Sequence, residues 1–268
     1  MNEDSDLSTL PVEAPAIQSG TSVQNGLEGV LATFGEVRKT SPLGSQSHLW
    51  SVMDALKRDI QQLPTLGRHS NVRVSWSLGQ GRWARVPWIA LMDQRETTST
   101  QRGTYVVFLF SDDLSGVYLT LNQGITDVIK ALGHTRGLNT LEVNAERMRS
   151  KIGSLREFGF IVDRGIDLHT SPGRGRDYEH STVAYKLYLK GEVPDDVSID
   201  HDLDALLKAY ATVLEKSTSQ APSSQRTWIF QANPEIFDID GAVAVLPELH
   251  WLVNQHRDAI RGGDQVFL

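Results

Sequence analysis

Arginine and tryptophan residues are interleaved in one short stretch of the chain. Trp76, Arg82, Trp83, Arg85 and Trp88 lie within thirteen positions. DNA phosphates attract cations and an extruded base stacks on an aromatic ring, so this mixture suits nucleic acid binding. Tryptophans on strands, such as Trp76 and Trp88, are more often core residues. Trp83, between two arginines in a turn, is less easily explained by burial. We therefore expect Arg82, Trp83 and Arg85 to contact DNA.

A second segment with suitable chemistry runs from His169 to Tyr178 and contains two glycines and two arginines. Arg174 and Arg176 could contact phosphates, and Tyr178 could stack on a base. The alternative interpretation is a solvated hairpin loop with no ligand.

The third segment is Asn122-Gln123-Gly124, at the end of an apolar run. Side-chain amides can hydrogen-bond a base edge, but they can equally cap the helix that follows. Tyr118, four residues earlier, is a further candidate for stacking. The complete expected DNA-binding set is Arg82, Trp83, Arg85, Tyr118, Asn122, Gln123, Arg174, Arg176 and Tyr178.

No motif for catalysis accompanies these residues. The chain has no G-x-x-x-x-G-K-[ST] phosphate loop, no H-E-x-x-H zinc motif and no G-x-S-x-G nucleophile elbow. The spacing of Glu179 and Lys186 does not match a nuclease motif. We expect no catalytic residue, no metal site, no cofactor and no small-molecule substrate.

Apolar periodicity predicts the elements that position these residues. Three strand-like runs lie within Val86 to Thr126 and form a three-stranded meander, and Val72 to Leu78 and Thr182 to Leu189 add two strands. Helical spacing appears from Leu27 to Val37, from Leu49 to Ile60, and in later segments that begin near Ile125, Leu141 and Asp200. The fold class is α+β (mixed α/β), with a central, mainly antiparallel sheet of about five strands packed against helices.

Composition limits the location and the partners. The net charge is −7, but residues 27–190 hold 21 Lys and Arg residues against 16 Asp and Glu residues. A local basic surface can attract DNA despite the overall charge. No apolar run is long enough to cross a bilayer, the N-terminus does not resemble a signal peptide, and cysteine is absent. We expect a cytoplasmic protein with no membrane association.

The strand runs also carry a resemblance. The segments "PWIA", "GTYVVFLF" and "VYLTLNQG" resemble the N-terminal DNA-binding domain of McrB-type, modified-DNA-dependent (type IV) restriction proteins, over about Leu27 to Lys216. The resemblance implies that the domain reads modified cytosine in double-stranded DNA by extruding the base. It also implies that an NTPase and a nuclease act elsewhere, because the motor that normally follows this domain is missing from the chain.

The expected organisation is a disordered tail (1–26), the McrB-type domain (27–216), a Ser/Pro-containing linker (217–226) and a final segment (227–268). The last segment resembles the opening of an EVE domain, a PUA-like reader of modified bases, and about forty residues are too few for that domain to fold alone. The competing functional hypothesis is a protein-interaction or regulatory module of a phage-defence system. It would use the acidic residues between 192 and 204 to bind a basic partner.

Overall fold

The computed structural model describes residues 22–44, 48–171, 174–219, 227–229 and 265–267. The chain divides into two compact units, Met1–Leu214 and Glu215–Leu268. No helix in the described residues is long and apolar enough to span a membrane.

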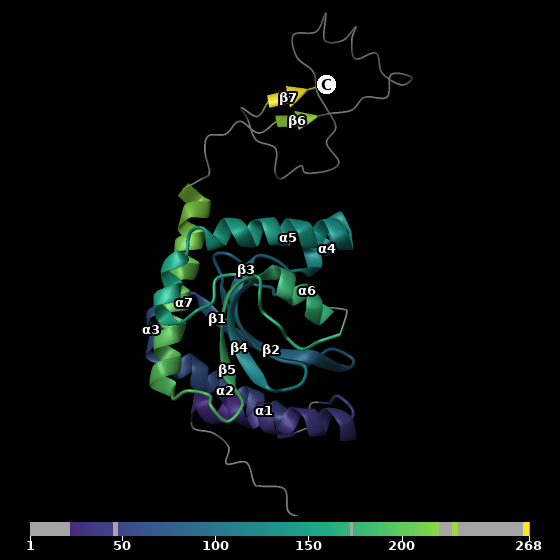
Figure 1. Ribbon diagram of the computed structural model, residues 1–268, viewed down its shortest axis with the longest axis vertical. Helices are drawn as coiled ribbons and strands as arrows, with labels where there is room; N and C mark the ends of the chain where they lie inside the picture. Colours follow the sequence, from purple (N-terminus) through teal and green to yellow (C-terminus); the bar gives the residue numbers. More distant parts are fainter. Residues whose placement is uncertain (1–21, 45–47, 172–173, 220–226, 230–264, 268) are drawn as a thin grey trace, which may run out of the picture. The chain divides into compact units, whose positions relative to one another are not determined.

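A five-stranded antiparallel sheet organises the first unit (Figure 1), and its strand order β1-β2-β3-β4-β5 follows the chain. The strands are β1 (Val72–Gly79), β2 (Trp83–Asp93), β3 (Thr104–Phe110), β4 (Gly116–Gln123) and β5 (Thr182–Leu189). All neighbours pair antiparallel, as in Val106 with Leu121 and Tyr118 with Leu187. The expected fold class and the five-stranded sheet are therefore confirmed.

Helices surround this sheet. They are α1 (Val23–Thr40), α2 (His48–Gln62), α3 (Pro64–Arg68), α4 (Thr126–Leu132), α5 (His134–Arg149), the 3-10 helix η1 (Gly153–Phe158), α6 (Arg174–Ser181) and α7 (Asp196–Ser219). Pro64 ends α2 and starts α3 because proline is tolerated in the first turn of a helix but not in its interior. In Figure 1, α1 and α5 lie at opposite ends of the sheet and α7 runs along one side of it.

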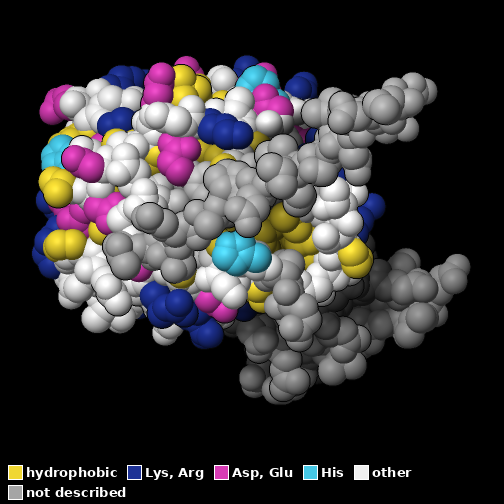
Figure 2. All heavy atoms as spheres, turned by 90° about the horizontal axis from the view of Figure 1, so that it is seen from below, with side chains coloured by type: hydrophobic (Ala, Val, Ile, Leu, Met, Phe, Trp, Pro, Cys, Tyr) yellow, Lys and Arg dark blue, Asp and Glu magenta, His cyan; other side chains and the backbone are white. Residues whose placement is uncertain are grey.

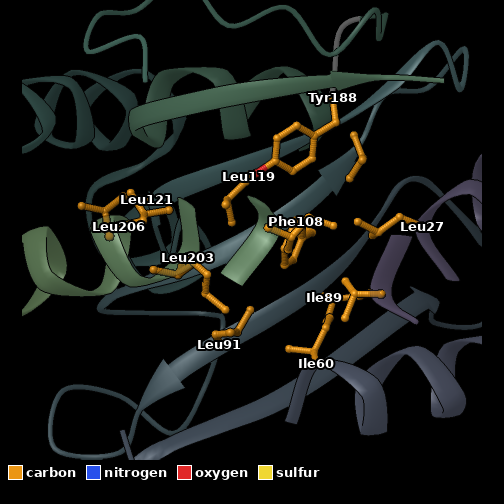
Figure 3. Close-up of a cluster of buried hydrophobic side chains, with 14 of the residues drawn as sticks. Leu27, Ile60, Ile89, Leu91, Phe108, Leu119, Leu121, Tyr188, Leu203 and Leu206 are labelled. Atoms are coloured by element: carbon orange, nitrogen blue, oxygen red, sulfur yellow. The ribbon is translucent and has the colours of Figure 1, made fainter. Parts of the chain in front are cut away.

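One face of the sheet forms the main core. Figure 3 shows side chains from α1, α2 and α7 meeting the strands: Leu27, Ile60, Leu203 and Leu206 from the helices, and Ile89, Leu91, Phe108, Leu119, Leu121 and Tyr188 from the strands. Each of these side chains is buried. Because strand residues alternate between faces, the other residues of β2, β3 and β4 point to the opposite side of the sheet.

The first helix begins four residues before the expected start at Leu27. Ser22 caps it, accepting a hydrogen bond from the backbone N–H of Asn25 at 3.1 Å. The carboxylate of Asp196, at the start of α7, accepts the backbone N–H groups of Val23 and Gln24 at 3.1 and 2.9 Å. These bonds satisfy N–H groups that a helix terminus leaves unpaired, so α1 extends to Val23, which is fully buried.

Other elements also differ from the sequence-based expectation, among them α7, which begins at Asp196 and not near Asp200. Residues 174–181 form the helix α6, where a hairpin loop was the alternative interpretation. The apolar run Phe160-Ile161-Val162, whose composition is also typical of a short strand, forms only a single bridge between Ile161 and Tyr185. The helix expected from Leu141 begins earlier, at His134.

In the second unit, β6 (Thr227–Ile229) pairs in parallel with β7 (Gln265–Phe267). Most of the EVE-like segment and the N-terminal tail lie outside the described residues, so those two assignments stay predictions.

Candidate nucleic-acid interface

The second face of the sheet carries a cluster of aromatic side chains, which we call the aromatic face. Its buried members are Val86, Ala90, Met92, Tyr105, Val107, Leu109, Tyr118, Ile166, Leu168 and Tyr185, and the half-buried Trp88 and Tyr178 pack against them. Trp88 belongs to β2, and Tyr178 is contributed by α6. Ile166 and Leu168 come from the segment before α6. The aromatic face is thus separate from the main core and is partly accessible.

A small pocket opens between these rings. Its lining is Trp88, Thr100, Tyr105, Val107, Leu109, Asn122 and Tyr178. The Tyr105 hydroxyl donates to the backbone oxygen of Thr100 at 3.0 Å, and burial raises the pKa of this phenol. The free volume is about 10 Å³, on the order of one water molecule. Entry of a pyrimidine would therefore require Trp88 or Tyr178 to move.

The three candidate segments meet at this face although they are far apart in the sequence. Arg85, in β2, donates a hydrogen bond to the Ser171 hydroxyl, in the segment that leads into α6. The Asn122 side chain, in β4, donates to the backbone oxygen of Tyr178 at 3.4 Å. The pocket joins the same segments, since Trp88, Asn122 and Tyr178 all line it.

Trp83 does not belong to this group. Its ring packs against the main core, edge-to-face with Phe34 at 5.6 Å between ring centroids and with Trp50 at 6.2 Å. Its indole N–H donates to the backbone oxygen of Ser41 at 2.7 Å. Trp83 and Trp88 are five positions apart in one strand, so alternation places them on opposite faces. The environment of Trp83 is that of a packing residue.

The two arginines beside Trp83 occupy different settings. Arg82 is exposed in the β1–β2 turn, and its side chain forms no ion pair within the described part of the chain. Arg85 lies 3.6 Å from the carboxylate of Asp112, which also pairs with Arg38 at 2.7 Å. The carboxylate of Asp112 thus ties Arg38 of α1 and Arg85 of β2 to the β3–β4 turn.

Tyr118 is buried beneath the segment that carries Asp167. Its hydroxyl donates to the backbone oxygen of Asp167 at 2.7 Å, and its ring meets Tyr185 edge-to-face at 5.9 Å. Burial, with a smaller contribution from the charge of Asp167, raises the pKa of Tyr118 to about 12. The side chain supports the floor of the aromatic face and does not reach the pocket lining.

Asn122 and Gln123 are also buried, and their amides form hydrogen bonds within the module. The Asn122 oxygen accepts from the Ser181 hydroxyl at 2.5 Å, and its nitrogen donates to Thr182 at 3.2 Å as well as to Tyr178. Gln123 donates to the backbone oxygens of Leu141 and Ser181 at 2.9 and 3.2 Å. These amides fasten α5 and α6 to the end of β4, which places Tyr178 over the sheet.

The remaining expected residues lie on α6. Arg176 is exposed and is 3.5 Å from Glu179. Arg174 begins the helix, and its side chain lies outside the described part of the structure. Tyr178 is half-buried against the aromatic face. The segment is therefore a helix that presents one aromatic ring to the pocket and one arginine to solvent.

Sequence reasoning did not select Trp88, Tyr105 or Thr100 for the site. The sequence pattern that could have identified Trp88 is the alternation of side chains along β2. Trp88 lies on the same face as Val86 and Ala90, whereas Trp83 and Ile89 lie on the opposite face. Thr100 lies in the polar connection between β2 and β3, and no sequence pattern indicates that this connection folds back over β3.

Charge is mixed on the face of the molecule that Figure 2 presents, which is the α1 side of Figure 1. Acidic and basic side chains are interspersed there, with no large area of one sign.

Comparison with known families gives a decisive match. Residues 30–215 match the family model described as the MrcB-like, N-terminal domain. The chain belongs to this family. The matched region covers the five-stranded sheet and the aromatic face, so these features form a McrB-like DNA-binding module of a restriction system. Among curated proteins, none matches the chain.

Proposed function

We propose that this McrB-like module reads modified cytosine in double-stranded DNA by accepting the extruded base in the pocket between Trp88, Tyr105 and Tyr178. The observation that carries the proposal is the convergence of separate segments on one aromatic pocket, where Trp88, Asn122 and Tyr178 meet. Extrusion costs a few kcal/mol, which stacking on aromatic rings offsets. Phosphate contacts alone cannot distinguish a modified base, so a pocket of this kind is required.

The module would act by recognition alone, with NTPase and nuclease activities supplied by other chains. The described part of the structure contains no group of three or more His, Cys, Asp or Glu residues that could hold a metal ion. Cytoplasmic location belongs to the same proposal, since the DNA of an invading phage is met there.

The alternative function, protein binding through the acidic residues between 192 and 204, has less support. Most of those carboxylates already have partners inside the module. Asp196 caps α1, Asp200 accepts the N–H of Thr65 at 2.9 Å, Asp202 binds Lys186 and Tyr188, and Asp204 binds Arg68 and Lys208. We therefore favour base recognition.

A comparison of Trp88→Ala with Trp83→Ala tests the proposal. Loss of a stacking ring typically costs about 1–3 kcal/mol, or roughly 5- to 150-fold in affinity. We expect Trp88→Ala to bind a duplex containing 5-methylcytosine more weakly than the parent by this factor. Its affinity for the unmodified duplex should be almost the same as that of the parent. Trp88→Phe should keep most of the preference because a ring remains.

Trp83→Ala is the matched control on the opposite face. It should destabilise the module by about 3 kcal/mol, the low end for truncating a packed tryptophan, and retain the affinity ratio between the two duplexes. Fluorescence anisotropy gives the affinities, and denaturant unfolding gives the stability. An unchanged ratio for Trp88→Ala, with the loss of preference in Trp83→Ala instead, would show that the pocket is misplaced.

A further inference from the structure

We propose that a second DNA contact lies beside the pocket, on a surface formed by α4, the first turns of α5 and Arg102. We call this surface the α4–α5 shoulder. Its ligand would be the phosphodiester backbone of the same duplex, on one flank of the extruded base. The inference rests on the proposed function, but it concerns residues that the candidate site does not include.

The first observation is that α4 is held at the surface. It contains Val128, Ile129 and Leu132, yet none of its residues is buried. Gly133, with φ of 78°, joins α4 directly to α5, a backbone conformation that suits glycine. The two helices pack mainly against each other, so the outer side of α4 is left open to solvent.

The second observation is the charge of the shoulder. Between Gly124 and Leu141 the chain has Lys130 and Arg136 against a single acidic residue, Asp127. Arg102 adds a third cation. All three cations are exposed, and within the described residues none of them forms an ion pair. Exposed cations without a carboxylate partner suit a polyanion, and each can neutralise one phosphate.

The third observation connects the shoulder to the pocket. The backbone N–H of Asp127 donates to the oxygen of Gln101 at 3.0 Å, next to the pocket residue Thr100. At the start of α5, His134 lies 2.9 Å from Asp177, next to the pocket residue Tyr178. Figure 1 shows α4 and the adjoining end of α5 close to α6. A base held in the pocket therefore brings its own backbone toward the shoulder.

Gly124 secures this connection. Its N–H donates to the oxygen of Gly103 at 2.8 Å, and a side chain at this position would collide with the backbone of Arg102. The loop that carries Arg102 can thus lie directly against the turn that leads into α4. The shoulder is a continuous surface built from two segments.

The sharpest test removes charge from the shoulder and, separately, from a distant helix. Lys130→Gln/Arg136→Gln is the shoulder variant. Lys57→Gln/Arg58→Gln on α2 is the matched control, because it also removes one lysine and one arginine. Affinity for a duplex with 5-methylcytosine and for its unmodified form is measured from low to moderate salt. Thermal unfolding verifies that both variants fold.

Each lost phosphate contact lowers the slope of log K against log[salt] by about 0.9. We expect a reduction of about 1.8 for the shoulder variant and none for the control, with the ratio between the two duplexes unchanged because phosphate contacts carry no base information. Arg102→Gln should lower the slope by about a further 0.9.

The two proposals fail in different ways. An unchanged slope in the shoulder variant, with a normal preference for modified DNA in the parent, overturns the shoulder alone. An equal slope change in the α2 control also overturns it, since the effect is then one of overall charge. Absence of any preference in the parent, with a shoulder-dependent slope, overturns the pocket and leaves the shoulder contact standing. Failure of the parent to bind DNA overturns both.

Discussion

Trp83 and Trp88 show that the sequence alone does not assign a strand residue to one face of a sheet. Interleaving with arginine drew attention to Trp83, whereas the structure packs it on Phe34 and leaves Trp88 at the pocket. The aromatic residues of this strand were therefore recognisable in the sequence, but the face of the sheet that each of them occupies was not. Which face becomes the core depends on where α1 and α2 dock, and that information is not local to β2.

Asn122 provides the residue-scale prediction. Its amide has no spare hydrogen-bonding group, so we expect it to position Tyr178 and not to read a base edge. Asn122→Ala should cost about 1–3 kcal/mol of stability, because it removes the buried hydrogen bonds that the amide makes with Tyr178, Ser181 and Thr182. It should also weaken binding of modified DNA more than binding of unmodified DNA. Denaturant unfolding and anisotropy measure the two effects, and equal weakening on both duplexes would contradict the positioning role.

At the scale of elements, the strands were predictable and α6 was not. The runs in β3 and β4 are mostly apolar, rich in β-branched and aromatic residues, and buried along their whole length, so their strand character is clear from sequence. In α6, Tyr178 is the one large apolar side chain, and no helical periodicity exists. The helix forms because Asn122, and hydrogen bonds from His134 and His180 to the carboxylates of Asp177 and Glu142, dock it from outside.

Glu179 on α6 gives a pH-dependent prediction. Burial raises the pKa of its carboxyl, opposed in part by the hydrogen bond from the Leu168 N–H. Because the folded-state pKa of Glu179 lies above its unfolded-state pKa, the protonated carboxyl contributes fully to the stability of the fold below about pH 4.3, the ordinary pKa of Glu. This contribution is lost as the pH rises through the folded-state pKa. Glu179→Gln resembles the protonated form and keeps the acceptor.

We therefore expect Glu179→Gln to have a higher melting temperature than the parent at pH 7 and an equal one near pH 4. Calorimetry across this range measures the difference. The exposed pair with Arg176 should matter little, since surface pairs contribute about 0–1 kcal/mol. A variant less stable than the parent at pH 7 would show that the charged form is needed.

At the scale of the whole molecule, the family match and the sheet agree with the expected DNA-binding domain, and the start of the first helix was the less accurate part. The apolar periodicity predicted that the first helix starts at Leu27, because the residues before Leu27 show no repeated apolar spacing. The structure starts α1 at Val23 through contacts with Asp196, which no local pattern could show.

Two fragments of the chain test where the folded unit begins. Residues 22–219 should unfold as a single cooperative unit. A fragment 27–219 should be less stable by about 2 kcal/mol, since it lacks the Ser22 cap and the buried Val23. Thermal unfolding of the two fragments measures the difference. Equal stabilities would place the start of the folded unit at Leu27 after all.

The bond between α1 and Asp196 also has a consequence for protein synthesis. The first helix leaves the ribosome early, but the carboxylate that completes its N-terminus is 173 residues further along the chain. Strand β4 likewise pairs with β5, which is synthesised much later. Because such distant contacts must form before the module is stable, the first half of the module cannot fold stably before α7 has been synthesised. A nascent chain is thus unable to bind DNA until α7 has been made, which separates synthesis from recognition in time.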